Sequence, residues 1–134
     1  MPQTLDQQRA AFAWEAATNG INQGGERYRN LSKGAPALIM TSGLMPVLAF
    51  YKSKDKEQHY RCLLDHIIRS IQREVWSQTL GSTQGHAQFK DFMLQLQRTD
   101  SQTYRRATDS ALETLKWIRQ FVDAVEQINS ETGR

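Results

Sequence analysis

The sequence predicts an all-α protein, a single compact bundle of about five or six helices. Apolar residues recur at helical spacing in two long stretches, near residues 54–80 and 102–129, which we expect to be the longest helices. No segment alternates between polar and apolar residues for long enough to indicate a strand. With 134 residues the chain can build a core without disulfides or metal. We therefore expect residues 1–134 to form a single helical domain.

The first forty residues predict two helices. Thr4 followed by Gln7 is typical of a capping box, and apolar residues at helical spacing follow as far as Gly20. Glycines between residues 20 and 25 predict a break. A second helix is expected over residues 26–41, interrupted or kinked near Gly34-Ala35-Pro36, because proline disfavours helical geometry in the residue before it.

A short apolar helix is predicted from about Gly43 to Lys52. Ser42 is expected to cap it, and Pro46 then falls in the first turn, where proline costs little. Its apolar residues surround the whole circumference, so we expect this helix to be packed on all sides. Lys52 and Lys54 follow directly. They could meet an acidic partner, or they could be the ordinary solvated end of a buried helix.

The second half of the chain begins with the long helix near 54–80. A loop is expected at 81–85, and a short helix from about Ala87 to Arg98. Ser101 is expected to cap the last helix, over 102–129. That helix carries a second apolar stripe beside its main one, and this stripe consists of Trp117, Phe121 and Ile128. The stripe belongs either to the core or to a contact with another chain.

The composition is that of a soluble globular protein with a modest excess of positive charge. The 17 Lys and Arg residues and 14 Asp and Glu residues give a net charge of +3. This balance permits a nucleic acid or an acidic protein as partner, but does not require one. The single cysteine, Cys62, excludes an internal disulfide and suits a reducing compartment. No leader or long apolar stretch is visible, so we expect a cytoplasmic chain that is not anchored to a membrane.

The sequence lacks the usual patterns of catalytic and cofactor sites. It has no glycine-rich phosphate loop and no paired cysteines at zinc spacing. His59, Cys62 and His66 lie on one side of the long helix and could ligate a metal. Ligands from a single helix rarely complete a tetrahedron, so packing beside the apolar stripe is the favoured interpretation. We therefore predict that the chain is not an enzyme, and that it has no catalytic residue, no metal and no other cofactor.

Basic residues are more clearly organised, along one polar face of each long helix. They are Lys54, Arg61 and Arg69 near 54–80, and Arg105, Arg106, Lys116 and Arg119 on the last helix. Such cations would neutralise phosphates without reading bases, which gives salt-sensitive and sequence-tolerant binding. The alternative is a solvated face with ion pairs between successive turns.

Two blocks of the sequence resemble a known family. Ser42-Gly43-Leu44, with Ala49-Phe50 and then Lys52 to Lys54, is similar to the central block of the small, all-helical subunit of the type III-B CRISPR effector, the Cmr or RAMP-module complex. The segment from Tyr104-Arg105-Arg106 through Trp117-Ile118 to Phe121 is similar to that family's C-terminal helix. The likeness extends over most of the chain.

The resemblance implies a non-catalytic subunit. Copies would stack into a filament beside the backbone subunit, along the channel where guide crRNA pairs with target RNA, and would hold the target strand by its backbone. The RNA-facing set would be Lys52, Lys54, Arg61, Arg69, Arg105, Arg106, Lys116 and Arg119, and the protein interface Trp117, Phe121 and Ile128. The alternative is a helical adaptor or regulatory module that binds another protein and never contacts RNA.

Overall fold

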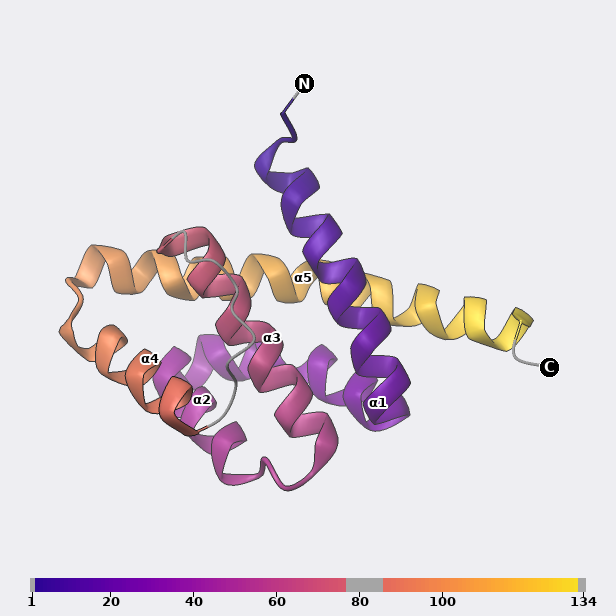
Figure 1. The fold of residues 1–134 in the computed structure, drawn as a ribbon, viewed down its shortest axis with the longest axis horizontal. Helices are drawn as coiled ribbons and strands as arrows, with labels where there is room; N and C mark the ends of the chain where they lie inside the picture. Colours follow the sequence, from indigo (N-terminus) through magenta and orange to yellow (C-terminus); the bar gives the residue numbers. More distant parts are fainter. Residues whose placement is uncertain (1, 77–85, 133–134) are drawn as a thin grey trace.

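Five helices follow one another along the part of the chain that the computed structural model describes, residues 2–76 and 86–132. They are α1 (Leu5–Ser42), α2 (Leu44–Ser53), α3 (Gln58–Val75), α4 (His86–Arg98) and α5 (Ser101–Thr132). The described residues contain no strand, and the helices form a compact bundle (Figure 1). The predicted all-α class is therefore confirmed.

The first helix consists of two segments that meet at Gly25. The predicted capping box is present, since the Gln7 N–H donates to Thr4 Oγ1 at 3.1 Å and the Thr4 N–H donates to Gln7 Oε1 at 2.8 Å. Gly25 has φ 60° and ψ −141°, which side-chain-bearing residues strongly disfavour. The chain turns sharply there and runs back across the molecule (Figure 1). The predicted break thus falls at Gly25, while residues 20–24 stay helical.

The helix is not interrupted near Gly34-Ala35-Pro36, because the backbone keeps helical angles through Pro36 to the end of α1. Residues on both sides of the proline are packed in the core. Ala35 is fully buried and Ile39 is 1% exposed. Packing of this face holds the helix in place and outweighs the local preference of proline.

Gly43 separates α1 from α2. Its N–H donates to the Ile39 carbonyl at 2.8 Å, and its φ of 95° turns the chain into the next helix. Ser42 is therefore the last residue of α1, and the prediction that it caps the short helix is wrong. Pro46 does lie in the first turn of α2.

The short helix α2 is buried on one side only, so the expectation of packing on all sides is wrong. Leu44 and Leu48 are fully buried, but Ala49 is exposed and Phe50 is 44% exposed. The helix packs mainly against α1 and α3, with a hydrogen bond from the Met45 N–H to Tyr104 Oη of α5, while other residues of α2 reach solvent.

The predicted apolar face of the third helix is confirmed, with Leu63, Ile67 and Ile71 at the centre of the core. The helix lies within the predicted range near 54–80 but is shorter, from Gln58 to Val75. Residues 54–57 form a turn in which the Lys54 N–H bonds the Tyr51 carbonyl at 3.0 Å. The helix ends at Val75 because Trp76 leaves helical geometry and its ring packs on Phe92 of α4. The loop predicted at 81–85 lies outside the described residues.

The last two helices agree with prediction within a few residues. α4 begins one residue earlier than expected, and α5 extends three residues beyond Asn129. Asp100, rather than Ser101, caps α5, because its carboxylate accepts the Thr103 N–H at 2.7 Å. Hydrogen bonds from Thr103 lower the pKa of Asp100.

The core lies where α1 and α3 pack on α5. α1 packs most extensively on α5 and next on α3, and α3 also packs on α5. Leu115 and Ile118 of α5 are fully buried in this core, with Tyr28 of α1. Within the described residues, none of the helices combines the length and the apolar character that crossing a bilayer requires.

Candidate nucleic-acid interface

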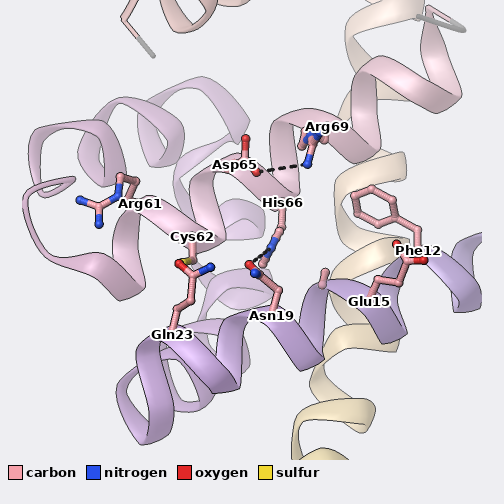
Figure 2. A pocket seen from close by; sticks show the side chains of 10 residues that line it. Phe12, Glu15, Asn19, Gln23, Arg61, Cys62, Asp65, His66 and Arg69 are labelled. Carbon is pink, nitrogen blue, oxygen red and sulfur yellow. Dashed lines mark hydrogen bonds and ion pairs between the residues drawn. The ribbon is translucent and has the colours of Figure 1, made fainter. Parts of the chain in front are cut away.

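A groove runs between the first segment of α1 and α3, and it contains two of the predicted RNA-facing residues, Arg61 and Arg69 (Figure 2). The groove encloses a cavity of about 550 Å³. α3 also contributes Cys62, Asp65 and His66, and α1 contributes Phe12, Glu15, Ala16, Asn19 and Gln23. The two helices therefore supply walls of different chemistry.

The arginines on the α3 wall are positioned by nearby oxygen atoms and still reach solvent. Arg61 Nη1 donates to the Asp55 backbone carbonyl at 3.0 Å, and the Arg61 side chain is exposed. Arg69 Nη1 lies 3.7 Å from Asp65 Oδ2, with 31% of its side chain exposed. Burial raises the pKa of Asp65, and the Arg69 charge opposes this effect. Both guanidinium groups can therefore approach an anion in the groove.

The floor of the groove is a buried hydrogen-bond network around His66. Its Nδ1 lies 2.8 Å from Tyr28 Oη and its Nε2 lies 3.1 Å from Asn19 Oδ1. Because an amide oxygen can only accept, Nε2 carries the proton and Nδ1 accepts from the Tyr28 hydroxyl. Burial lowers the pKa of His66 to about 4, so the imidazole is neutral.

The candidate metal ligands of α3 are engaged in other contacts. Both ring nitrogens of His66 are hydrogen-bonded, and Cys62 Sγ donates to Gln23 Oε1 at 3.2 Å. The His59 ring stacks near Tyr60, with ring centroids 4.7 Å apart. Within the ranges that the structure describes, no three His, Cys, Asp or Glu side chains are grouped as a metal site requires. These contacts favour the packing interpretation of the three residues.

The predicted basic residues of α5 do not share the groove. Arg105, Arg106, Lys116 and Arg119 are all exposed. Arg106 alone lines a second hollow, of about 390 Å³, between the start of α1, the end of α3 and α5. Lys116 Nζ lies 3.9 Å from Glu113 Oε1.

Lys52, in the last turn of α2, and Lys54, directly after that helix, have different surroundings. Lys52 Nζ lies 2.8 Å from Asp55 Oδ2 and 5.5 Å from the centre of the Phe89 ring. Lys54 is exposed, with its ammonium group 6.0 Å from the centre of the Phe50 ring. Lys54 is therefore the more available of the two to an external partner.

Arg73 also belongs to this basic surface, although the sequence-based set of RNA-facing residues does not include it. The guanidinium carbon of Arg73 lies 4.7 Å from the centre of the Phe12 ring, and Arg73 lines the second hollow together with Arg9 and Arg106. The signal was available, because residues 61, 65, 69 and 73 follow one another at four-residue spacing on a helix. The predicted basic residues of this helix instead ended at Arg69.

The predicted protein-interface residues differ in exposure. Trp117 and Phe121 are partly buried, and the Phe121 ring packs edge-on against Trp14 of α1 with centroids 5.2 Å apart. Ile128 is 44% exposed near the end of α5. Trp117 and Phe121 therefore help to hold α5 on α1, while Ile128 is free to contact another chain.

The fold and this surface define a class, a small helical bundle with an arginine-lined groove on one side. Residues 5–125 match the family described as CRISPR-associated protein (Cas_Cmr5). The chain belongs to this family, the small non-catalytic subunit of the type III-B CRISPR effector, which confirms the resemblance seen in the sequence. Membership implies association with the other Cmr subunits. No curated protein sequence matches the chain.

Proposed function

We propose that this chain has no catalytic activity of its own, stacks with copies of itself along the backbone subunit of the effector, and holds the target RNA strand through its basic surface. The observation that supports RNA contact is the exposure of Arg105, Arg106 and Arg119, which have no ion-pair partner among the described residues. Cations that no carboxylate neutralises can contact phosphates, and base pairing with the guide would supply sequence specificity. The full proposed set is Lys52, Lys54, Arg61, Arg69, Arg105, Arg106, Lys116 and Arg119.

The proposed contact with another subunit uses the outer edge of α5. Ile128 is exposed there, and the partly buried rings of Trp117 and Phe121 support the surface beside it. An exposed isoleucine beside partly buried aromatic rings can contribute apolar area to a subunit contact.

The RNA contact can be tested at the C-terminal end of α2. Replacing Lys52 and Lys54 by glutamate should weaken retention of target RNA by the assembled complex, because two cations near the phosphates are lost. Loss of two phosphate contacts should also reduce the slope of log K against log salt concentration by about 1.4. The measurement is filter binding of labelled target RNA over a salt series.

The matched control replaces Arg27 and Arg98 by glutamate, which changes the net charge equally at two exposed residues outside the proposed set. This control should behave as the wild type. An unchanged salt slope in the Lys52 and Lys54 variant would exclude these two lysines from the RNA contact.

A second function, a helical adaptor without RNA contact, is supported by one observation. An apolar hollow of about 420 Å³ lies between α1, α2 and α3, and Leu38 and Phe50 at its edge are 38% and 44% exposed. Electrophoretic mobility of single-stranded RNA with the purified chain and with the assembled complex, at low and high salt, separates the two functions. An adaptor would not shift the RNA by itself, and the complex that carries the Lys52 and Lys54 variant would shift it as the wild-type complex does.

A further inference from the structure

We propose that the groove between the first segment of α1 and α3 binds single-stranded RNA, with its phosphates along α3 and its bases against α1. This inference rests on the proposed RNA-holding function and deepens it, because it names one groove, which would hold a part of the RNA strand that is not paired with the guide. Four features of the groove support it.

The first feature is the row of cations on the α3 wall. Arg61, Arg69 and Arg73 lie on one side of α3, and the rise of an α-helix places the first and last about 18 Å apart. Arg61 and Arg69 line the groove, and Arg73 covers the ring of Phe12 at its end. A row of this length can follow several successive phosphates of an extended strand.

The second feature is the chemistry of the α1 wall, which suits nucleobases rather than phosphates. Phe12 offers an aromatic ring at one end of the groove (Figure 2). The amide oxygen of Asn19 accepts a hydrogen bond from His66 of α3. The amide oxygen of Gln23 accepts hydrogen bonds from Cys62 and Gln58 of the same helix. The NH₂ groups of Asn19 and Gln23 have no partner among the described residues, so they can donate to base edges. Stacking and edge contacts of this kind are how proteins recognise single-stranded RNA.

The third feature is the placement of negative charge. Glu15 on α1 and Asp65 on α3 also line the groove. These carboxylates repel phosphates from the floor, but they can accept hydrogen bonds from the exocyclic amines of bases. The strand therefore orients with its backbone outward, near the arginines. A duplex cannot adopt this arrangement, because its base edges are already paired.

The fourth feature is the continuity of the groove with the second hollow. Arg73 lies over Phe12 of the first cavity and lines the second one with Arg9 and Arg106. Arg9 is fixed by two hydrogen bonds to Glu74, at 2.9 and 3.0 Å. Arg106 has no ion-pair partner among the described residues, so it can contact a phosphate where the strand leaves α3.

The test measures binding of the purified full chain to a fluorescent single-stranded RNA of mixed sequence, and to the same strand annealed to its complement. Fluorescence anisotropy over a salt series gives the affinity and the salt slope. Arg61→Gln with Arg69→Gln should weaken single-strand binding and reduce the salt slope by about 1.4, which corresponds to two phosphates. Arg27→Gln with Arg98→Gln removes the same charge elsewhere and should leave binding unchanged.

A second variant tests the α1 wall without changing the charge. Phe12→Leu keeps an apolar side chain beneath Arg73 but removes the aromatic ring. It should weaken single-strand binding about fivefold or more, as loss of one stacked base does, with an unaltered salt slope. Circular dichroism melting of every variant tests whether the fold is retained. If these residues had only a structural role, both variants would change the affinity alike. The arginine variant would then not differ from Phe12→Leu in its salt slope.

Equal binding of duplex and single strand, no binding of single strand by the purified chain, or equal behaviour of the groove and control variants would each overturn the inference. The proposed function is judged separately, by the Lys52 and Lys54 variant in the assembled complex. If that variant loses RNA while the groove variants do not, only the groove assignment fails. If neither loses RNA, both fail.

Discussion

At the scale of single residues, the hydrogen bond between Tyr28 and His66 links the second segment of α1 to α3 beneath the groove. Tyr28 is fully buried and His66 is 6% exposed, and burial raises the pKa of the tyrosine, which keeps its hydroxyl available as a donor. Asn19 completes the arrangement from the first segment of α1. The neutral imidazole thus joins both segments of α1 to α3.

The lowered pKa of His66 predicts a dependence of stability on pH. The pKa of His66 falls from 6.5 to about 4 in the folded chain, so the unfolded chain binds the proton more readily between these values. Stability is therefore full above pH 6.5 and declines as pH falls towards 4, by up to about 1.4 kcal/mol per pH unit. Asp65 opposes part of this decline, because burial raises its pKa. Urea unfolding at several pH values measures the dependence.

The comparison of two histidine variants isolates the effect. His66→Gln should be less stable at pH 7 and should lose most of the decline between pH 6.5 and 4. His59→Gln, on the same helix but outside the buried network, should keep the decline. A His66→Gln chain with the same pH dependence as the wild type would show that another group is responsible.

At the scale of elements, the two segments of α1 are held together by a close approach of Gly20 to the Tyr28 ring. A Cβ atom at Gly20 would collide with carbons of that ring, which is fully buried and cannot move aside. Gly34 lies in the second segment of the same helix, and a Cβ there would meet nothing within 4 Å. One glycine is therefore required by packing, and the other is not.

Two alanine substitutions should have opposite effects. Gly20→Ala should destabilise the chain by about 1–3 kcal/mol or more, as overpacking of a tight core does. Gly34→Ala should stabilise it by about 0.4–1 kcal/mol, because alanine is the better helix former and restricts the unfolded chain. Chemical denaturation of both variants measures the difference. Equal effects would contradict the role assigned to the Tyr28 ring.

Elements with strong periodicity could be predicted from the sequence, and their junctions could not. Ile67 and Ile71 recur at helical spacing, so the core face of α3 was found. Whether Ser42 or Gly43 ends a helix depends on a backbone angle that neither residue type decides alone. The groove required knowledge that α3 packs on the first segment of α1. Arg61 and Arg69 could therefore be proposed singly, but not placed opposite Phe12.

At the scale of the whole molecule, the seam between α1 and α5 combines an aromatic contact with surface ion pairs. Arg29 Nε lies 2.8 Å from Asp123 Oδ1 and 3.2 Å from Glu126 Oε1, and Lys33 Nζ lies 2.8 Å from Asp123 Oδ2. Exposed pairs of this kind add little energy individually. They fix the position of α5 along α1, and the apolar contacts beside them stabilise the seam.

The position of Phe121 at this seam leads to a test of the proposed subunit contact. Phe121→Ala should leave the isolated chain folded with a lower melting temperature, because the ring is only partly buried against Trp14. It should also loosen assembly with the other subunits. Ile128→Ala, at a more exposed residue, should leave melting unchanged and affect assembly alone. Co-purification of the effector subunits measures assembly, and unfolding of the isolated Phe121→Ala chain would refute the contact role.

The pairing of α1 with α5 also determines when the chain can fold during its synthesis. Arg29 and Asp123 meet across 94 positions of the sequence, and α1 packs most extensively on α5. While residues 101–132 are still inside the ribosome, α1 can pack on α2 and α3, but its most extensive partner is missing. Contacts of such long sequence separation form late in folding. Each copy therefore completes its core only after α5 has emerged from the ribosome, and a chain that stalls before α5 leaves exposed the apolar residues of α1 that α5 would cover.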